Sequence, residues 1–148
     1  MTETAGAFEL HPQLARDCVE VGDFPLSRLL LMNDRTYPWF LLVPRRQGLR
    51  EIFELEDEGV LQLARESACL GRALLRHLAG DKLNVAALGN LVPQLHVHHI
   101  VRFRSDPAWP RPVWGVVPAE PYREPELDTL LADVRELLRK DGLRLPAG

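Results

Sequence analysis

Two apolar runs separated by a short polar segment most constrain the fold of this chain. The first, residues 26–32, has the sequence LSRLLLM, and the second, residues 39–44, has the sequence WFLLVP. The turn-forming pair Asn33-Asp34 follows the first run, and Pro44 ends the second. Leucine-rich runs occur in helices as well as in strands, but runs of six or seven residues are short for a helix. We therefore predict a buried β-hairpin.

The clearest helical pattern covers residues 56–78. Apolar and small residues recur there at spacings of three and four, which places them on one helical face: Val60, Leu63, Ala64, Ser67, Leu70, Gly71, Leu74 and Leu78. We also predict a helical turn at 11–16, strands near 18–21 and at 82–88, and a C-terminal amphipathic helix at 126–140. Strands, one long helix, further strands and a terminal helix indicate an α+β fold, with a helix packed on a sheet.

Length, charge and cysteine usage narrow the class of protein. The 148 residues suit one domain, so we expect a single domain over 1–148, with an irregular segment rich in proline and tryptophan at 104–125. A formal net charge of −3 argues against nucleic-acid binding. The chain has neither a signal-peptide pattern nor an apolar run that could span a bilayer, so we expect no membrane association. Cys18 and Cys69 lie outside any C-x-x-C spacing, which suggests the reducing cytoplasm.

The strand-like segment 94–103, QLHVHHIVRF, contains three of the five histidines of the chain. Alternate side chains of a strand face opposite ways. One face therefore has Gln94, His96, His98, Ile100 and Arg102, and the other is mostly apolar but includes His99. At ~3.4 Å per residue, His96 and His98 lie ~7 Å apart at Cα. We expect the apolar face to pack against the long helix, with His99 as a hydrogen-bonded packing residue.

Three interpretations of His96 and His98 compete. In the first, both imidazoles face water on a partly exposed strand. In the second they bind zinc or iron, which requires a third and usually a fourth ligand, and no Asp, Glu or Cys stands at a suitable spacing nearby. In the third, one neutral imidazole attacks phosphorus, while the other imidazole and an amide stabilise charge on the phosphate oxygens.

The run QLHVHHI at 94–100 resembles the signature of the histidine triad (HIT) superfamily, in which three histidines alternate with hydrophobic residues. The preceding GNLV resembles the lead-in of that family, LLLMND…WFLLVPRR resembles its first hairpin, and the long helix lies where the family has one. The resemblance covers about residues 26–103. It implies a HIT-like antiparallel sheet with a long central helix, and a homodimer that hydrolyses or transfers nucleoside monophosphates.

The resemblance also implies roles for individual residues. His96 matches the histidine that attacks the α-phosphorus to give a nucleotidyl-histidine, His98 matches the one that contacts phosphate oxygens, and Gln94 occupies the first position as an orienting hydrogen-bond donor. The implied ribose and phosphate contacts are polar side chains of the hairpin turn and of the strand and loop before the motif, namely Asn33, Asp34, Asn84 and Asn90. The substrate is expected to be a purine nucleotide. No metal site or cofactor is required, although magnesium can arrive with the substrate.

Three departures from the family pattern leave two functions open. Gln94 can donate a hydrogen bond but cannot act as an acid near neutral pH. Leu91 replaces a small hydroxyl residue, and His99 stands where a hydrophobic residue is usual. The chain is therefore either a cytoplasmic nucleotidyl hydrolase or transferase, similar to diadenosine polyphosphate hydrolases, or a nucleotide-binding protein with little or no turnover.

Aromatic and basic residues outside the motif have two interpretations each. Trp109 and Trp114 either stack on a base or close the pocket, or they pack the long loop or a dimer contact. Arg45, Arg46 and Arg50 either steer a polyphosphate or belong to a solvated loop.

Overall fold

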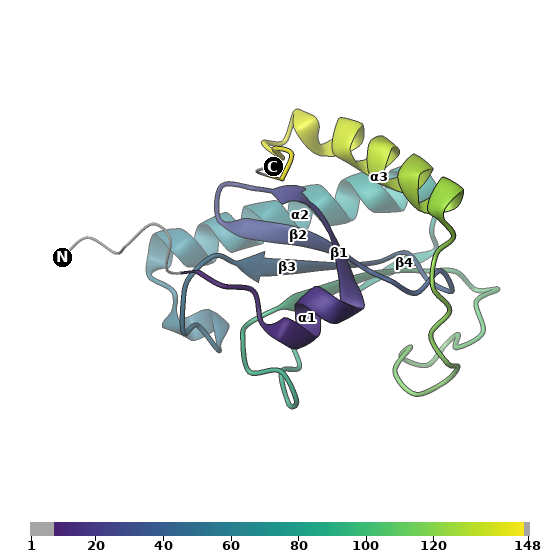
Figure 1. The fold of residues 1–148 in the computed structure, drawn as a ribbon, viewed down its shortest axis with the longest axis horizontal. Helices are drawn as coiled ribbons and strands as arrows, with labels where there is room; N and C mark the ends of the chain where they lie inside the picture. The colour runs from purple at the N-terminus through teal and green to yellow at the C-terminus, as the bar shows by residue number, and fades with distance from the viewer. Residues whose placement is uncertain (1–7, 147–148) are drawn as a thin grey trace.

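A computed structural model describes residues 8–146 of the chain (Figure 1). The elements in order are α1 (Pro12–Asp17), β1 (Cys18–Asp23), β2 (Ser27–Met32), β3 (Trp39–Pro44), the 3-10 turn η1 (Ile52–Glu54), α2 (Asp57–Leu78), β4 (Lys82–Ala86), β5 (Val97–Arg102) and α3 (Glu124–Arg139). The strands form one antiparallel sheet in the order β1-β2-β3-β5-β4. The α+β fold with a long central helix and a C-terminal helix is confirmed.

The predicted hairpin is formed by β2 and β3, with Leu31 opposite Phe40 and Ser27 opposite Pro44. Successive side chains of these strands enter two different apolar clusters. Leu29, Leu31, Phe40 and Leu42 belong to the cluster under the long helix, whereas Leu30, Leu41 and Val43 belong to a second cluster on the opposite face. The sheet is thus covered on both faces, which explains why these strands are continuously apolar instead of alternating with polar residues.

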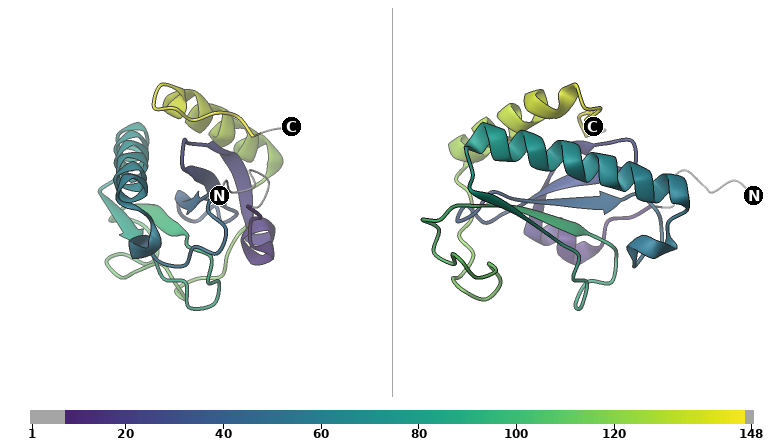
Figure 2. Two further views of the ribbon diagram at one scale, coloured as in Figure 1. Left: turned by 90° about the vertical axis from the view of Figure 1, so that its left-hand side faces the viewer. Right: turned by 180° about the vertical axis from the view of Figure 1, so that it is seen from behind.

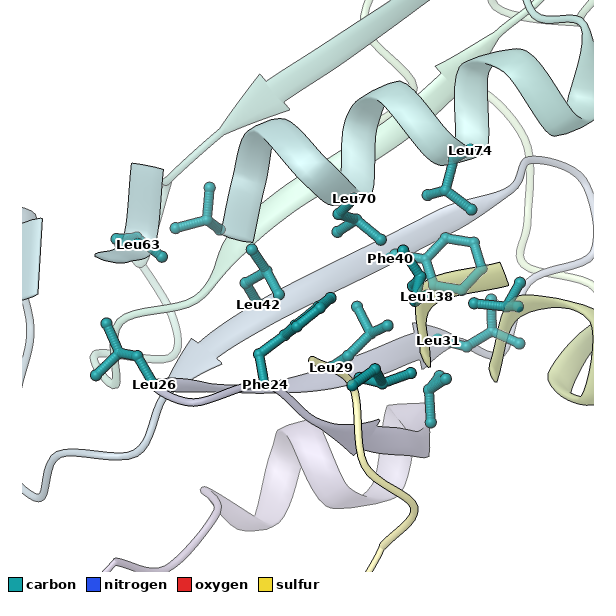
Figure 3. Packing of buried hydrophobic residues seen from close by; sticks show 14 of the residues in the cluster. Phe24, Leu26, Leu29, Leu31, Phe40, Leu42, Leu63, Leu70, Leu74 and Leu138 are labelled. Carbon is teal, nitrogen blue, oxygen red and sulfur yellow. The ribbon is translucent and has the colours of Figure 1, made fainter. Parts of the chain in front are cut away.

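Helices α2 and α3 cover one face of the sheet, and α1 lies on the other (Figures 1 and 2). Leu63, Leu70 and Leu74 of α2 point toward the strands, and Leu138 of α3 joins them (Figure 3). The apolar stripe predicted for α2 is therefore the side that packs on the sheet. In the part of the chain that the structure describes, no helix is both long and apolar enough to cross a membrane.

The second face of the sheet is covered by α1 and by the irregular loop that follows β5. Leu14 of α1 and Ala108 and Val113 of the loop are buried there against the strands. An ion pair holds the loop in place, because the guanidinium of Arg102 binds both carboxylate oxygens of Asp106 at 2.8 and 2.9 Å. The same carboxylate accepts hydrogen bonds from three loop amides, those of Phe103, Ala108 and Trp109. This covered face is the one that His96 and His98 occupy.

Candidate active site

The histidine segment lies in the middle of the sheet, because β5 pairs with β3 on one side and with β4 on the other. The strand begins at Val97, so Gln94 and His96 lie in the residues just before it. The predicted division of faces holds: Val97 and Val101 enter the cluster under α2. His96 and His98 are only 7% and 5% exposed. The interpretation in which both imidazoles face water is therefore wrong.

His96 is held in one tautomer by the backbone. Its Nδ1 lies 2.7 Å from the carbonyl oxygen of Gln94. A carbonyl oxygen only accepts hydrogen bonds, so Nδ1 carries the proton and, in the neutral ring, Nε2 keeps its lone pair. A narrow crevice, lined among others by Leu88, Gly89 and Arg50, reaches this side chain. His96 thus presents the unprotonated nitrogen that a nucleophile needs.

His98 is held in the opposite tautomer by a tryptophan. The indole Nε1 of Trp39 donates to its Nδ1 at 2.9 Å, so the proton of the neutral ring lies on Nε2. Burial, assisted by the neighbouring His96 and His99, lowers the pKa of His98 to about 4. At neutral pH, His98 is therefore an uncharged N–H donor beside His96, whose ring centroid is 5.0 Å away. No local pattern in the sequence points to this role of Trp39, which lies 59 residues from His98.

A second tryptophan lies over His98. The ring of Trp114, in the loop after β5, is edge-on to His98 at 5.1 Å and to Trp39 at 5.6 Å. Trp114 itself is 38% exposed. Of the two tryptophans considered in the sequence, Trp114 borders the histidines, whereas Trp109 lies over the Arg102 guanidinium at 5.7 Å.

The side chain of Gln94 binds the N-terminal segment of the chain. Its amide nitrogen donates to the carbonyl oxygen of Glu9 at 2.9 Å, and its oxygen accepts from the backbone N–H of His11 at 2.8 Å. Gln47 adds a third bond by accepting from the N–H of Glu9 at 3.0 Å. The glutamine in the first triad position therefore fixes residues 9–11 against the segment that leads into β5.

Most of the other predicted binding residues already have partners within the protein. Asn33 accepts from the N–H of Tyr122, and Asp34 from those of Thr36 and Glu120, so both hold the segment that leads into α3. Asn84 accepts from the guanidinium of Arg102 at 2.8 Å. Asn90 is exposed in the loop between β4 and β5. The structure thus brings His96 and His98 together, with the Gln94 carbonyl bonded to His96, whereas Asn33, Asp34 and Asn84 are engaged by other parts of the protein.

His99 is a packing residue, as expected from its place on the apolar face of the strand. It is fully buried between the sheet and α2, where its Nε2 lies 2.7 Å from the hydroxyl of Ser67 and its Nδ1 lies 3.0 Å from the carbonyl oxygen of Val97. Burial lowers its pKa to about 4, so the ring is neutral near pH 7. Both ring nitrogens are satisfied, which leaves His99 no part in the chemistry at His96.

Residues 8–146 contain no group of three or more His, Cys, Asp and Glu side chains placed to hold a metal ion. The histidine pair therefore has no third ligand of these types in the part of the chain that is described.

Comparison with known proteins places the site in a family. The model of the HIT domain matches residues 13–105. The chain belongs to the HIT family. No curated protein matches the chain. Membership in the HIT family supports nucleotide hydrolysis or transfer as the general activity.

Two crystal structures of HIT proteins are close to this one over almost their whole length. A histidine triad protein from Marinobacter aquaeolei VT8 is 50% identical with a TM-score of 0.89, and the match covers 91% of this chain and 98% of that one. A histidine triad protein from Bradyrhizobium japonicum is 47% identical with a TM-score of 0.86, and the match covers 88% and 97%.

Proposed function

We propose that this HIT protein is a nucleotidyl hydrolase or transferase that cleaves at the α-phosphate of a dinucleoside polyphosphate or a nucleoside phosphoramidate, with a purine nucleotide as the group transferred. The observation that supports it best is the pair of opposite tautomers. His96 has a free lone pair on Nε2, and His98 has an N–H on its own Nε2. A nucleophile next to a neutral hydrogen-bond donor suits attack on a phosphorus whose oxygens gain charge.

The proposed reaction has two displacements. In the first, Nε2 of His96 forms a bond to the α-phosphorus, the bond from phosphorus to the leaving group breaks, and its electron pair departs with that group. The imidazole of the nucleotidyl-histidine is then positively charged, which favours its departure. In the second, water oxygen attacks phosphorus, the Nε2–P bond breaks, its electron pair returns to Nε2, and one proton passes to solvent. A transferase would use another nucleophile in place of water.

Each remaining residue has a proposed part. His98 donates to a phosphate oxygen, and Gln94 acts through residues 9–11, whose position it fixes. Asn90 is the proposed amide contact to phosphate, because its neighbour Gly89 lines the crevice at His96. The ribose contacts proposed for Asn33 and Asp34, and a phosphate contact from Asn84, require these side chains to share their present partners with the substrate.

The proposal includes the setting of the reaction. It needs no bound metal or other cofactor, and magnesium enters only as a complex with the substrate. We propose that the protein acts in the cytoplasm on a nucleotide substrate, without nucleic acid or membrane. We also propose a homodimer, for which the edge strand β4 offers exposed Val85, with exposed Leu88 just beyond it.

A nucleotide-binding protein with little turnover is the second candidate. It is favoured by the closed state of the site, in which Trp114 lies over His98 and both polar atoms of the Gln94 side chain are engaged by backbone.

Turnover separates the two candidates. Wild-type protein, His96→Ala and the matched control His77→Ala, which changes an exposed histidine of α2, are incubated with adenosine 5′-phosphoramidate or diadenosine polyphosphate, and AMP is quantified. We expect His96→Ala to abolish turnover with an unchanged circular dichroism spectrum, and His77→Ala to match wild type. Wild-type rates from His96→Ala would refute the mechanism. Tight nucleotide binding without AMP release by the wild type would favour the second candidate.

A further inference from the structure

A groove of about 510 Å³ lies beside the triad, between residues 9–12, 47–50 and 93–94. Two of its lining residues link it to His96. Gln94 lines the groove, and its carbonyl oxygen accepts from Nδ1 of His96. Arg50 lines both the groove and the crevice that reaches His96. Gln94 and Arg50 therefore connect the groove to the surroundings of His96.

One wall of the groove exists because of the glutamine in the first triad position. Residues 9–12 are not part of the sheet, and the amide of Gln94 fixes them by one donated and one accepted bond to the backbone of Glu9 and His11. Gln47, on the facing loop, binds Glu9 as well. The wall and the loop are thus held at a set distance by side-chain amides that do not titrate.

The lining of the groove is mostly apolar and nearly without net charge. Leu10, Pro12, Leu49 and Pro93 line it, together with the two amides Gln47 and Gln94, one imidazole, His11, and one cation and one anion, Arg50 and Glu9. Such a surface is typical of sites for organic groups, in which a few polar residues fix orientation.

The other arginines of the basic cluster do not reach the groove. Arg45 donates to the carbonyl oxygens of Phe24 and Pro25, and Arg46 lies 3.8 Å from the carboxylate of Glu56. A dinucleoside polyphosphate would bring several negative charges beyond the α-phosphate, and such charges are usually matched by several cations. Arg50 alone, opposed by Glu9, does not provide them. It does suffice for a single phosphate at the junction of groove and crevice.

We propose that this groove holds an apolar organic leaving group, an acyl chain or an amine joined to the α-phosphate that His96 attacks, and that Gln94 is the positioning residue that builds the groove. The proposal rests on the function proposed above and selects among its substrates. When the Nε2–P bond forms, the P–O bond of an acyl phosphate or the P–N bond of a phosphoramidate breaks. A carboxylate departs with the electron pair and needs no proton, whereas an amine nitrogen takes one proton from solvent, since Gln94 has none to give.

The expected effect grows with chain length. Burying one methylene fully tightens binding roughly fourfold. In an open groove the gain in binding free energy is about half as large, so each methylene tightens binding about twofold. A hexyl chain has five more methylenes than a methyl group, so we expect about 30-fold tighter binding for the hexyl compound.

Binding is measured on the His96→Ala protein, so that no ligand is consumed. Calorimetry compares N-methyl and N-hexyl adenosine phosphoramidates, the acetyl and hexanoyl acyl-sulfamate analogues of acyl adenylates, and diadenosine tetraphosphate. We expect a preference for the longer chain of about 30-fold in the amine pair, or of about 16-fold in the acyl pair, whose chains differ by four methylenes, and the pair that reaches its expected preference identifies the linkage. Equal affinity for short and long chains, or tighter binding of diadenosine tetraphosphate than of the hexyl and hexanoyl compounds, would overturn the proposal.

Variants test whether the preference arises in the groove. Pro93→Glu introduces a charge into the lining and should reduce the ratio of long-chain to short-chain affinity to about one. Leu61→Glu, at an exposed position of α2, should keep it. Gln94→Ala should lose the ratio, and Gln94→Asn should restore part of it if the amide acts by holding residues 9–11. A ratio retained in Gln94→Ala would refute its positioning role.

Wild-type turnover distinguishes this proposal from the function on which it rests. AMP release from methyl and hexyl substrates at the same kcat/KM would refute the groove and leave the hydrolase standing. A chain-length preference in binding with no AMP release would refute the hydrolase and leave the groove standing.

Discussion

Replacing Trp39 with phenylalanine removes the donor on which the tautomer of His98 depends. Within residues 8–146, the indole N–H at 2.9 Å is the hydrogen bond made to Nδ1 of His98. Phenylalanine keeps an apolar ring in the cluster that Trp39 occupies, but it leaves Nδ1 buried without a partner. The proton of His98 is then no longer confined to Nε2, the nitrogen that we propose to face the phosphate.

The size of the effect follows from this bond. A buried acceptor left unsatisfied costs about 1–3 kcal/mol, and a loss of about 1–2 kcal/mol in the transition state corresponds to roughly 5- to 30-fold in rate. We expect kcat to fall by roughly tenfold. The indole donor also stabilises the neutral ring, so its loss should raise the pKa of His98 from about 4 toward the ordinary value of 6.5.

The assay combines steady-state AMP release with an NMR titration of the imidazole signals. Trp109→Phe is the matched control, because Trp109 lies over Arg102, whereas Trp39 and Trp114 are the tryptophans paired with His98. It should leave kcat and the pKa of His98 unchanged. An unchanged kcat together with an unchanged pKa of His98 in Trp39→Phe would refute the argument from the tautomer.

Three further predictions concern acid stability, the first triad position and the loop. His98 and His99 have pKa values of about 4 in the folded protein against 6.5 ordinarily, so the unfolded state binds more protons between these two pH values. The free energy of unfolding, measured with urea, should therefore fall by roughly 3 kcal/mol per histidine as pH drops from 6.5 to 4. A free energy of unfolding that stays constant over this range would contradict this. Gln94→His should preserve or raise AMP release, because it restores a titratable group; a large loss would show that the bonds to residues 9–11 matter more. Arg102→Met should destabilise the fold by about 3–5 kcal/mol, because it leaves Asp106 buried without its cation. It should also speed amide hydrogen exchange at residues 108–114, and unchanged exchange there would show that another contact holds the loop.

The hairpin and the long helix could be predicted from the sequence because their signals are local. Residues 39–44 are apolar without interruption, and the stripe of α2 repeats at helical spacing, so each segment specifies its own structure. The assignment of residues to the two faces of the histidine strand could be predicted from the alternation of side chains along a strand. The burial of His96 and His98 could not be predicted in this way, because it depends on how α1 and the loop after β5 cover the sheet.

The partners of the site residues could not be predicted, because they come from distant parts of the chain. Trp39 and His98 are 59 residues apart, and His11 and Gln94 are 83 apart. Asn33 and Asp34 follow a strand at a turn, where short polar side chains commonly accept hydrogen bonds from backbone amides. These side chains suit contacts to a ligand as well as a turn, and the bonds that they make to the amides of residues 120 and 122 depend on the tertiary fold.

The nucleotidyl-histidine is the species that tests the mechanism most directly. Wild-type protein is mixed with adenosine 5′-phosphoramidate, quenched at times shorter than one turnover, digested under alkaline conditions that preserve P–N bonds, and analysed by mass spectrometry. We predict one AMP adduct, located on His96, that forms before free AMP appears and is absent from His96→Ala. Release of AMP without any adduct, or an adduct on another residue, would contradict the assignment of His96 as the nucleophile.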